Sequence, residues 1–204
     1  MTGLDNFKSN EKELMDFYGY KGTFGRIKIR IKFFNSWFYH SLAYSSPIPS
    51  WVIRFQRRRG VKIGKNCHIS PYVLIDLLHP ELIKIEDNVT ISSNSMIFAH
   101  INPTSNEFLK NHGYPRTIKP VVIKKGAIIS VGCIIIAGVT VGKNSIVGAG
   151  SVVNQDIPDY CVVVGNPARV VKKIDHWMSW DINNNITNIV QNTKNHNGKN
   201  SWIY

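Results

Sequence analysis

Aliphatic residues recur at every sixth position through the second half of the chain. The series continues without a gap through Ile123, Ile129, Ile135, Val141, Val147 and Val153. Four positions after each of the first five members comes a small or branched residue, at Ala127, Cys133, Val139, Ser145 and Ser151. An α-helix would repeat its apolar face about every 3.6 residues and an amphipathic strand about every 2, so neither explains this period. The pattern, punctuated by glycines, predicts very short strands and turns that stack as the coils of a solenoid.

The same period appears upstream in two shorter runs, which are interrupted twice. Ile63, Ile69 and Ile75 form one run, and Ile85, Ile91 and Ile97 form the next. The step of ten residues between the runs predicts a small bulge at residues 77–81, and the step of twenty-six that follows predicts a long insertion at residues 98–120. Insertions in repeat proteins lie at corners and often carry function, so we expect functional residues in or beside this insertion.

Two stretches resemble the hexapeptide-repeat acyltransferases. Residues 126–174 are similar to the last coils of that superfamily, with a D-I-P turn at 156–158 and a G-N-P-A-R motif at 165–169. Residues 85–100 resemble the coil that carries its catalytic histidine. The resemblance covers residues 60–174 and is strongest to maltose, galactoside and surface-polysaccharide O-acetyltransferases. It implies an all-β fold, a left-handed parallel β-helix, assembled as a homotrimer with active sites between subunits.

The chain outside the coils differs in composition and charge. We expect a basic, aromatic region at 1–60, the β-helix domain at 61–174 and an asparagine-rich tail at 175–204. The formal net charge is +12, and residues 1–62 contribute twelve Lys or Arg against four Asp or Glu. Pro47, Pro49 and Gly60 bound a segment that we interpret as a short link.

A stripe of apolar residues with helical spacing runs through residues 25–44, at Ile27, Ile31, Phe34, Phe38 and Leu42. Its first part also alternates isoleucine with Lys or Arg, which leaves a strand open as an alternative. A solenoid needs its first coil covered, and we interpret the stripe as the covering face. The alternative is peripheral contact with an anionic membrane surface or a lipid-linked glycan.

Several classes of protein are disfavoured by composition. No apolar run approaches the roughly 18 residues of a membrane-spanning helix, and the first residues lack the pattern of a signal peptide, so we expect a cytoplasmic protein. Nucleic-acid binding is not expected, because no helix-turn-helix, zinc or RNA-binding signature accompanies the positive charge. The three cysteines, at 67, 133 and 161, lack CxxC spacing and are interpreted as buried free thiols.

Histidine is the residue type suited to accept a proton from a sugar hydroxyl at neutral pH. Of the seven histidines, only His100 and His112 lie in the long insertion. His100 aligns with the catalytic base of the resembling family, so we predict that it is the general base of a direct transfer. Asp76, His79 and His112 are candidate contacts for the acceptor. Asp76 could instead orient His100, or bond its own backbone in the bulge, and the sequence leaves this open.

The resemblance also assigns contacts with acetyl-CoA, and no metal. Positions that bind the pantetheine arm align with Val131, Ala149, Asn154 and Gln155, and positions that meet the phosphates align with Arg169, Lys172 and Lys173. Two departures from the family pattern are Ile128-Ile129-Ser130 in place of Trp-Ile-Gly and Asn154-Gln155 in place of Thr-Lys. The second departure removes a cation beside the coenzyme.

The resulting hypothesis is an acetyl-CoA-dependent O-acetyltransferase that acts on a carbohydrate, a precursor of a surface or capsular polysaccharide. N-acetylation of an amino sugar and acetylation of a small free sugar are alternatives that differ only in the acceptor pocket. A zinc carbonic anhydrase on the same solenoid would need three converging imidazoles. A non-enzymatic scaffold would be expected to lack His100 or Arg169.

Overall fold

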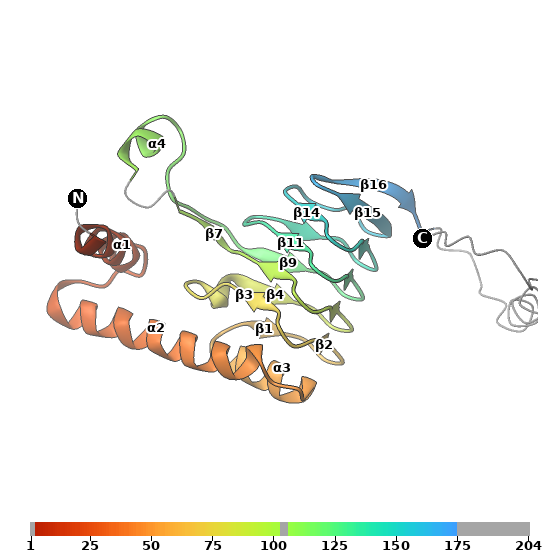
Figure 1. Ribbon diagram of the computed structural model, residues 1–204, viewed down its shortest axis with the longest axis horizontal. Coiled ribbons are helices and arrows are strands. Elements are labelled where there is room, and N and C mark those ends of the chain that lie inside the picture. Colours follow the sequence, from red (N-terminus) through yellow and green to blue (C-terminus); the bar gives the residue numbers. More distant parts are fainter. Residues whose placement is uncertain (1–2, 103–105, 175–204) are drawn as a thin grey trace, which may run out of the picture. The chain divides into compact units, whose positions relative to one another are not determined.

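The computed structural model describes residues 3–102 and 106–174 (Figure 1). The chain divides into units of residues 1–174 and 175–204. The predicted asparagine-rich tail forms the second unit and lies outside the described residues.

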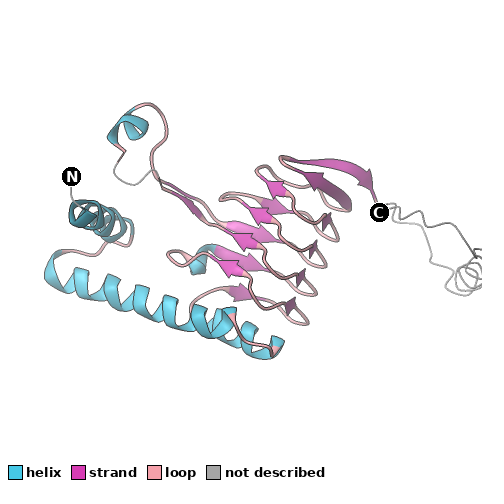
Figure 2. Ribbon diagram, viewed as in Figure 1, coloured by secondary structure: helices cyan, strands magenta, loops and turns pink. Residues whose placement is uncertain are grey.

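In the described part of the chain, three parallel sheets form the faces of a solenoid (Figure 2). The first sheet contains β1 (Lys62–Ile63), β4 (Ile83–Ile85), β9 (Val121–Ile123) and β12 (Thr140–Val141). The second contains β2 (His68–Ile69), β5 (Thr90–Ile91), β10 (Ile128–Ile129), β13 (Ile146–Val147) and β15 (Cys161–Gly165), closed by the antiparallel β16 (Ala168–Lys173). The third contains β3 (Leu74–Ile75), β6 (Met96–Ile97), β11 (Ile134–Ile135) and β14 (Val152–Val153). Consecutive strands visit the sheets in turn, so three hexads complete one coil.

The hexad residues fill the interior of the solenoid, as their spacing predicts. Ile123, Ile129 and Ile135 are completely buried, and so are the small residues Ala127 and Cys133 between them. The turns between strands require a residue in the left-handed backbone region. Asn94 (φ 62°) and Gly132 (φ 69°) supply it in adjacent coils, and asparagine and glycine tolerate that conformation best. The predicted coils are therefore confirmed.

The cysteines follow the prediction with one exception. All three are free thiols, and Cys133 and Cys161 are buried, but Cys67 is only partly buried. Cys67 lies in the first coil of the solenoid, where it packs at the margin of the core.

The N-terminal region is helical and consists of α1 (Gly3–Phe17), α2 (Gly22–Tyr44) and α3 (Pro49–Arg58). The strand alternative for the start of α2 is wrong. The interpretation of residues 45–60 as a link is also wrong, because most of it forms α3. Proline at the first position of a helix is favourable, so Pro49 begins this helix rather than preventing it. Val52 and Gln56 of α3 are buried, and α3 packs against β1 and β2.

The apolar stripe of α2 does not cover the solenoid, which corrects the interpretation made from the sequence. Ile27, Ile31, Phe34, Phe38 and Leu42 are all exposed. The packed face of α2 is the opposite one and carries Gly25, Ile29, Ser36, His40 and Ala43. Small residues there permit close approach, and polar partners fix it: the Ser36 hydroxyl, for example, donates to the Leu77 carbonyl oxygen (2.7 Å). Hydrogen bonding and shape, rather than side-chain hydrophobicity, determine which face of α2 packs against the rest of the protein.

Both predicted interruptions are present. The short one contains a 3-10 turn, Pro80–Leu82, and the long one contains β7 (His100–Ile101), α4 (Glu107–Asn111) and β8 (Thr117–Ile118). β7 and β8 pair as antiparallel strands that extend the loop away from the coils (Figure 1). Within residues 3–102 and 106–174, none of the helices combines the length and the apolar character needed to cross a membrane.

Candidate functional site

The two interruptions leave the solenoid at the same edge, in adjacent coils. The short one begins after β3 and the long one after β6, and these strands pair in register with Ile75 opposite Ile97. The Asp76 amide donates to the Ile97 carbonyl oxygen (2.9 Å), which places the start of one interruption against the start of the other. Side chains from both, with Tyr18 from the turn after α1, form a cluster that we call the polar corner: Tyr18, Asp76, His79, Glu81 and His100.

Asp76 connects the two interruptions through its carboxylate. One oxygen, Oδ2, lies 2.6 Å from Nδ1 of His100 and accepts from the Ala99 amide (2.8 Å). The other, Oδ1, accepts from the amides of Leu78 (2.8 Å) and His79 (3.1 Å). Asp76 therefore both bonds its own backbone and orients His100, the two roles that the sequence left open. The Asp76 side chain is completely buried, whereas that of His100 remains 18% exposed.

The protonation of this pair follows from its contacts. Burial by itself raises the pKa of Asp76, but the hydrogen bond and charge of His100 and the amides of His79 and Ala99 outweigh it and lower the pKa to about 2. Asp76 is thus an ionised carboxylate at neutral pH and can only accept hydrogen bonds. It requires the proton of a neutral His100 to be on Nδ1, which leaves Nε2 as the nitrogen that can accept a proton.

A buried arginine holds the backbone beneath Asp76. Arg59, the residue directly after α3, donates to the carbonyl oxygens of Ile75 (3.0 Å) and Asp76, and its other contacts include Ser36 and His40 of α2. Burial lowers the pKa of Arg59 to about 10, so the guanidinium is still charged at neutral pH. Burial and the charge of Arg59 lower the pKa of His40 to about 4, so this neutral imidazole can accept a hydrogen bond from Arg59.

His79 lies inside the polar corner rather than on its surface. Its side chain is completely buried, packed against the rings of Phe17 and Tyr18, with its ring centroid 5.5 Å from that of His100. Nδ1 lies 2.7 Å from the hydroxyl of Tyr18, which donates to Glu81 (2.6 Å). Burial lowers the pKa of His79 to about 4. Its Nε2 has no hydrogen-bond partner in the described part of the chain.

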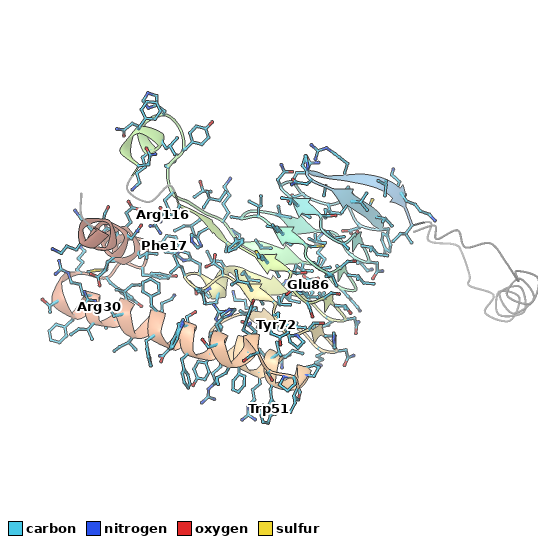
Figure 3. The ribbon with its side chains drawn as sticks, viewed as in Figure 1. Phe17, Arg30, Trp51, Tyr72, Glu86 and Arg116 are labelled. Atoms are coloured by element: carbon cyan, nitrogen blue, oxygen red, sulfur yellow. The ribbon has the colours of Figure 1, made fainter. Side chains whose placement is uncertain are left out.

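Helix α1 also anchors the long loop. Glu13 accepts from Arg116 (2.6 Å) and from Lys110, while Asn10 accepts from Arg116 (2.7 Å) and Asn102 (2.9 Å). In Figure 3, Arg116 lies between α1 and the base of the loop. The position of the loop beyond His100 is therefore set by residues almost a hundred positions earlier in the sequence.

The residues aligned with coenzyme contacts occupy exposed turns of later coils. Val131 follows β10 and Ala149 follows β13, so they lie in the same turn of adjacent coils, where the Gly150 amide donates to the Val131 carbonyl oxygen (2.9 Å). Asn154 and Gln155 follow β14, so they lie at the C-terminal ends of the strands of the third sheet, as the polar corner does. Val131 and Ala149 precede β11 and β14, so they lie at the N-terminal ends of those strands.

The predicted phosphate contacts lie on β16, at the last part of the second sheet. Arg169, Lys172 and Lys173 are exposed there, and Nη1 of Arg169 donates to the carbonyl oxygen of Ala168 (2.8 Å). His112, the remaining acceptor candidate, follows α4 and is exposed, with its ring stacked on Phe108 (4.1 Å between centroids). Among residues 3–102 and 106–174, no group of three or more His, Cys, Asp or Glu side chains is arranged to hold a metal ion.

Four residues of this region escaped sequence analysis: Glu13, Tyr18, Arg59 and Glu81. Each acts across a long sequence separation, such as the 63 residues between Tyr18 and Glu81. No local motif marks such a contact. The only sequence signal is the position of Glu81 within the short interruption.

Comparison with known proteins agrees with this architecture. The family model described as hexapeptide repeat of succinyl-transferase matches residues 120–155. A maltose O-acetyltransferase from Clostridium difficile 630 has a similar structure, with TM-score 0.59, 26% identity, and coverage of 72% of this chain and 89% of that one. A galactoside acetyltransferase in complex with coenzyme A gives TM-score 0.58, 25% identity, and coverage of 72% and 82%. The chain therefore resembles the hexapeptide-repeat acetyltransferases in its repeat and in its fold.

Curated relatives share the repeat over part of their length. The putative acetyltransferase YvoF of Bacillus subtilis is 34% identical over 122 residues, which cover 60% of this chain and 64% of the relative. A 2,3,4,5-tetrahydropyridine-2,6-dicarboxylate N-acetyltransferase of Thermotoga petrophila is 62% identical over 61 residues, 30% of this chain and 26% of that protein. The chain thus spans less than two thirds of these hexapeptide-repeat relatives.

Proposed function

We propose that this protein is an acetyl-CoA-dependent O-acetyltransferase whose acceptor is a carbohydrate hydroxyl, with His100 as general base. The observation that carries the proposal is the 2.6 Å contact between His100 Nδ1 and the buried carboxylate of Asp76. It fixes the tautomer and the ring orientation of an imidazole that remains accessible at the edge of a rigid coil. Such a base contributes about 10² to 10⁴ in rate to a proton-transfer step.

The reaction follows from this geometry. Nε2 of His100 accepts the proton of the acceptor hydroxyl while the hydroxyl oxygen attacks the thioester carbonyl carbon. The tetrahedral intermediate then collapses: the carbon–sulfur bond breaks, and the coenzyme A thiolate leaves and takes the proton from the imidazolium. Asp76 stabilises the transient positive charge on His100, because it stays ionised throughout. No acyl-enzyme is formed.

Acetyl-CoA is the proposed donor, held by backbone groups at Val131, Ala149, Asn154 and Gln155, with Arg169, Lys172 and Lys173 meeting its phosphates. The similar galactoside acetyltransferase was solved with coenzyme A, which supports this choice. The residues present fit the task, since the turns are exposed and β16 carries the cations. Guanidinium and ammonium groups are suited to phosphate binding.

The active unit is proposed to be a homotrimer. Val131 and Ala149 lie at the N-terminal ends of the strands of the third sheet, whereas His100 lies beyond their C-terminal ends. This separation supports a site built from His100 of one subunit and these turns of its neighbour. Sedimentation equilibrium tests the assembly. A monomer at micromolar concentration that still transfers acetyl groups would contradict the shared site.

A sugar of a surface-glycan precursor is the proposed acceptor, and N-acetylation is the second candidate. The sugar is supported by the maltose and galactoside enzymes among the similar structures. N-acetylation is favoured by the 62% identity over 61 residues with an N-acetyltransferase. The two reactions share the donor and the base and differ only in the nucleophile.

The function is tested by incubating the protein with labelled acetyl-CoA and a panel of sugars, amino sugars, nucleotide-sugars and lipid-linked oligosaccharides. We expect the label on a sugar oxygen, located by mass spectrometry and NMR, and its loss in His100→Ala. Label on nitrogen would support the second candidate. Transfer to none of these acceptors, with a folded protein, would overturn the carbohydrate proposal.

A further inference from the structure

Helix α2 carries an exposed apolar ridge along the side opposite to the packed one. The ridge consists of Phe24, Ile27, Ile31, Phe34, Phe38 and Leu42, spaced three or four residues apart, and Phe24 and Phe34 are 83% and 61% exposed. Trp51 of α3 is also exposed, and Figure 3 shows it projecting away from the coils. A continuous apolar face of this kind marks an interaction site more often than a solvated surface.

The charges that α2 and α3 themselves contribute around the ridge are all positive, and one of them, Arg30, is paired with Glu11 of α1 (2.6 Å). The sequence contains no Asp or Glu between Asp16 and Asp76, a stretch that includes all of α2 and α3. At about 100° of rotation per residue, Arg26 and Arg30 fall on one flank of the ridge, and Lys28 falls on the other. If a second copy of this chain bound here, its positively charged rim would face the same positively charged rim and be repelled. A surface for self-association would therefore ordinarily carry both positive and negative charges.

Helix α3 extends the same chemistry next to the ridge. Tyr39, Trp51, Arg54, Phe55 and Arg58 line a hollow of about 330 Å³, with the Arg58 guanidinium 5.9 Å from the centre of the Tyr39 ring. A neighbouring hollow of about 410 Å³ joins Lys28 and Ile31 of α2 to Arg58 of α3. Aromatic rings and arginines together are suited to the headgroup level of a bilayer, where one end of the side chain is apolar and the other polar.

From these observations we propose that the outer face of α2 and α3 is a docking surface for an anionic phospholipid bilayer. Helix α2 would lie in the plane of the interface, with its apolar ridge inserted among the acyl chains and its Lys and Arg flanks at the phosphates. The opposite face of α2 is packed on the protein, so docking requires no unfolding. The proposal goes beyond the acetyl transfer and does not depend on it.

Co-sedimentation of the full chain with vesicles tests the proposal. We expect binding to phosphatidylcholine vesicles that contain phosphatidylglycerol, weak binding to phosphatidylcholine alone, and a decrease as salt is added. The double variant Ile31→Asp with Phe34→Asp should lose more than about tenfold in binding, because it removes inserted apolar groups and adds repulsion. Its melting temperature should remain that of the wild type, since both side chains are exposed.

A matched control makes the same change of charge elsewhere. Val170→Asp with Val171→Asp alters two exposed residues of β16 and should bind vesicles within about twofold of the wild type. Arg54→Gln and Arg58→Gln should each weaken binding by about fivefold, the effect of one cation near an anionic surface.

Three results would overturn the proposal. The first is a wild-type protein that stays in solution with anionic vesicles at low salt. The second is equal loss of binding in both double variants, which would reduce the effect to net charge. The third is a shift from a larger to a smaller assembly on Ile31→Asp with Phe34→Asp, without vesicle binding by the wild type, because a second copy would then cover the ridge.

Discussion

The regular coils and the polar corner are neighbouring regions that bury different kinds of side chain. In the coils, inward positions are aliphatic or small, and the polar groups of the backbone are paired from coil to coil. In the polar corner, a carboxylate and an imidazole are buried, and each depends on specific partners. The repeat provides fixed positions, and its interruption provides groups that can change their charge.

The two regions should also respond differently to mutation. Burying an isoleucine in a coil stabilises the protein by about 1.5 to 3 kcal/mol through the hydrophobic effect, and its loss should leave the chemistry unchanged. Removing one partner of a buried ion pair leaves the other charge uncompensated and costs about 3 to 5 kcal/mol. Substitutions in the corner therefore have to be chosen to separate catalysis from stability, and each has a counterpart in the coils.

The largest expected effect is that of His100→Ala. We predict a fall in kcat of about 10² to 10⁴ with the affinity for coenzyme A close to that of the wild type, and a lower melting temperature, because the buried carboxylate of Asp76 loses its partner. His68, an exposed histidine of β2, is the matched control, and His68→Ala should keep wild-type kcat. A His100→Ala enzyme with more than about a third of the wild-type kcat would contradict the role of this residue.

The next effect is that of Asp76→Asn, expected to lower kcat by about 10- to 1,000-fold. The amide no longer demands a proton on Nδ1 of His100, so Nε2 ceases to be the basic nitrogen. Asp87 accepts from the Lys65 amide (2.7 Å) in a coil turn, which makes Asp87→Asn the control. A loss of kcat equal in the two variants, or a change confined to KM, would assign Asp76 a purely structural role.

The third effect concerns stability and pH. The pKa values of His40 and His79 are about 4, below the ordinary value near 6.5, because both are buried. Unfolding therefore binds protons: the stabilisation is complete above about pH 6.5 and is lost as pH falls toward 4. By about pH 5 each histidine should cost on the order of 1 to 2 kcal/mol.

Thermal melts between about pH 7.5 and pH 5 measure this dependence. The variant His79→Gln should reduce the slope, whereas His68→Gln, in a coil, should not change it. A melting temperature that is constant across this range would contradict this account, because it would mean that burial does not lower the pKa values of these histidines in the folded protein.

The smallest effect is expected for Glu13→Gln, which weakens the contacts of α1 with Lys110 and Arg116. Partly exposed ion pairs contribute up to about 1 kcal/mol, so we predict a two- to fivefold rise in the KM of the acceptor, with little change in kcat. Asp16→Asn, one turn further along α1 and exposed, is the control. An unchanged KM would mean that anchoring the loop does not shape the acceptor site.

The sequence predicted the coils and three of the five residues of the polar corner, for reasons that can be traced. Ile129 or Val147 can be placed from its hexad alone, because each coil repeats the environment of the last. His100 was assigned because it aligns with the catalytic base of the resembling family, and Asp76 because it ends the coil below His100. Tyr18 and Arg59 were not found, since they reach the corner from the ends of helices whose packing no repeat determines.

The packed face of α2 illustrates the same limit. Hydrophobic spacing selected Ile31 and Phe34, whereas Ser36 and His40 were buried through hydrogen bonds with residues distant in sequence. Periodicity identifies a helix with an apolar face, but it does not determine which face packs when the opposite one offers specific polar partners.

The central claim is that Asp76 and His100 act as one catalytic unit, and a double-mutant cycle on kcat tests it most directly. Because Asp76 works only through His100, the double variant His100→Ala with Asp76→Asn should be about as slow as His100→Ala alone. Separate contributions would instead multiply, so that the double variant is slower than His100→Ala by the full factor that Asp76→Asn causes in the wild type. The first result would confirm the unit, and the second would contradict it.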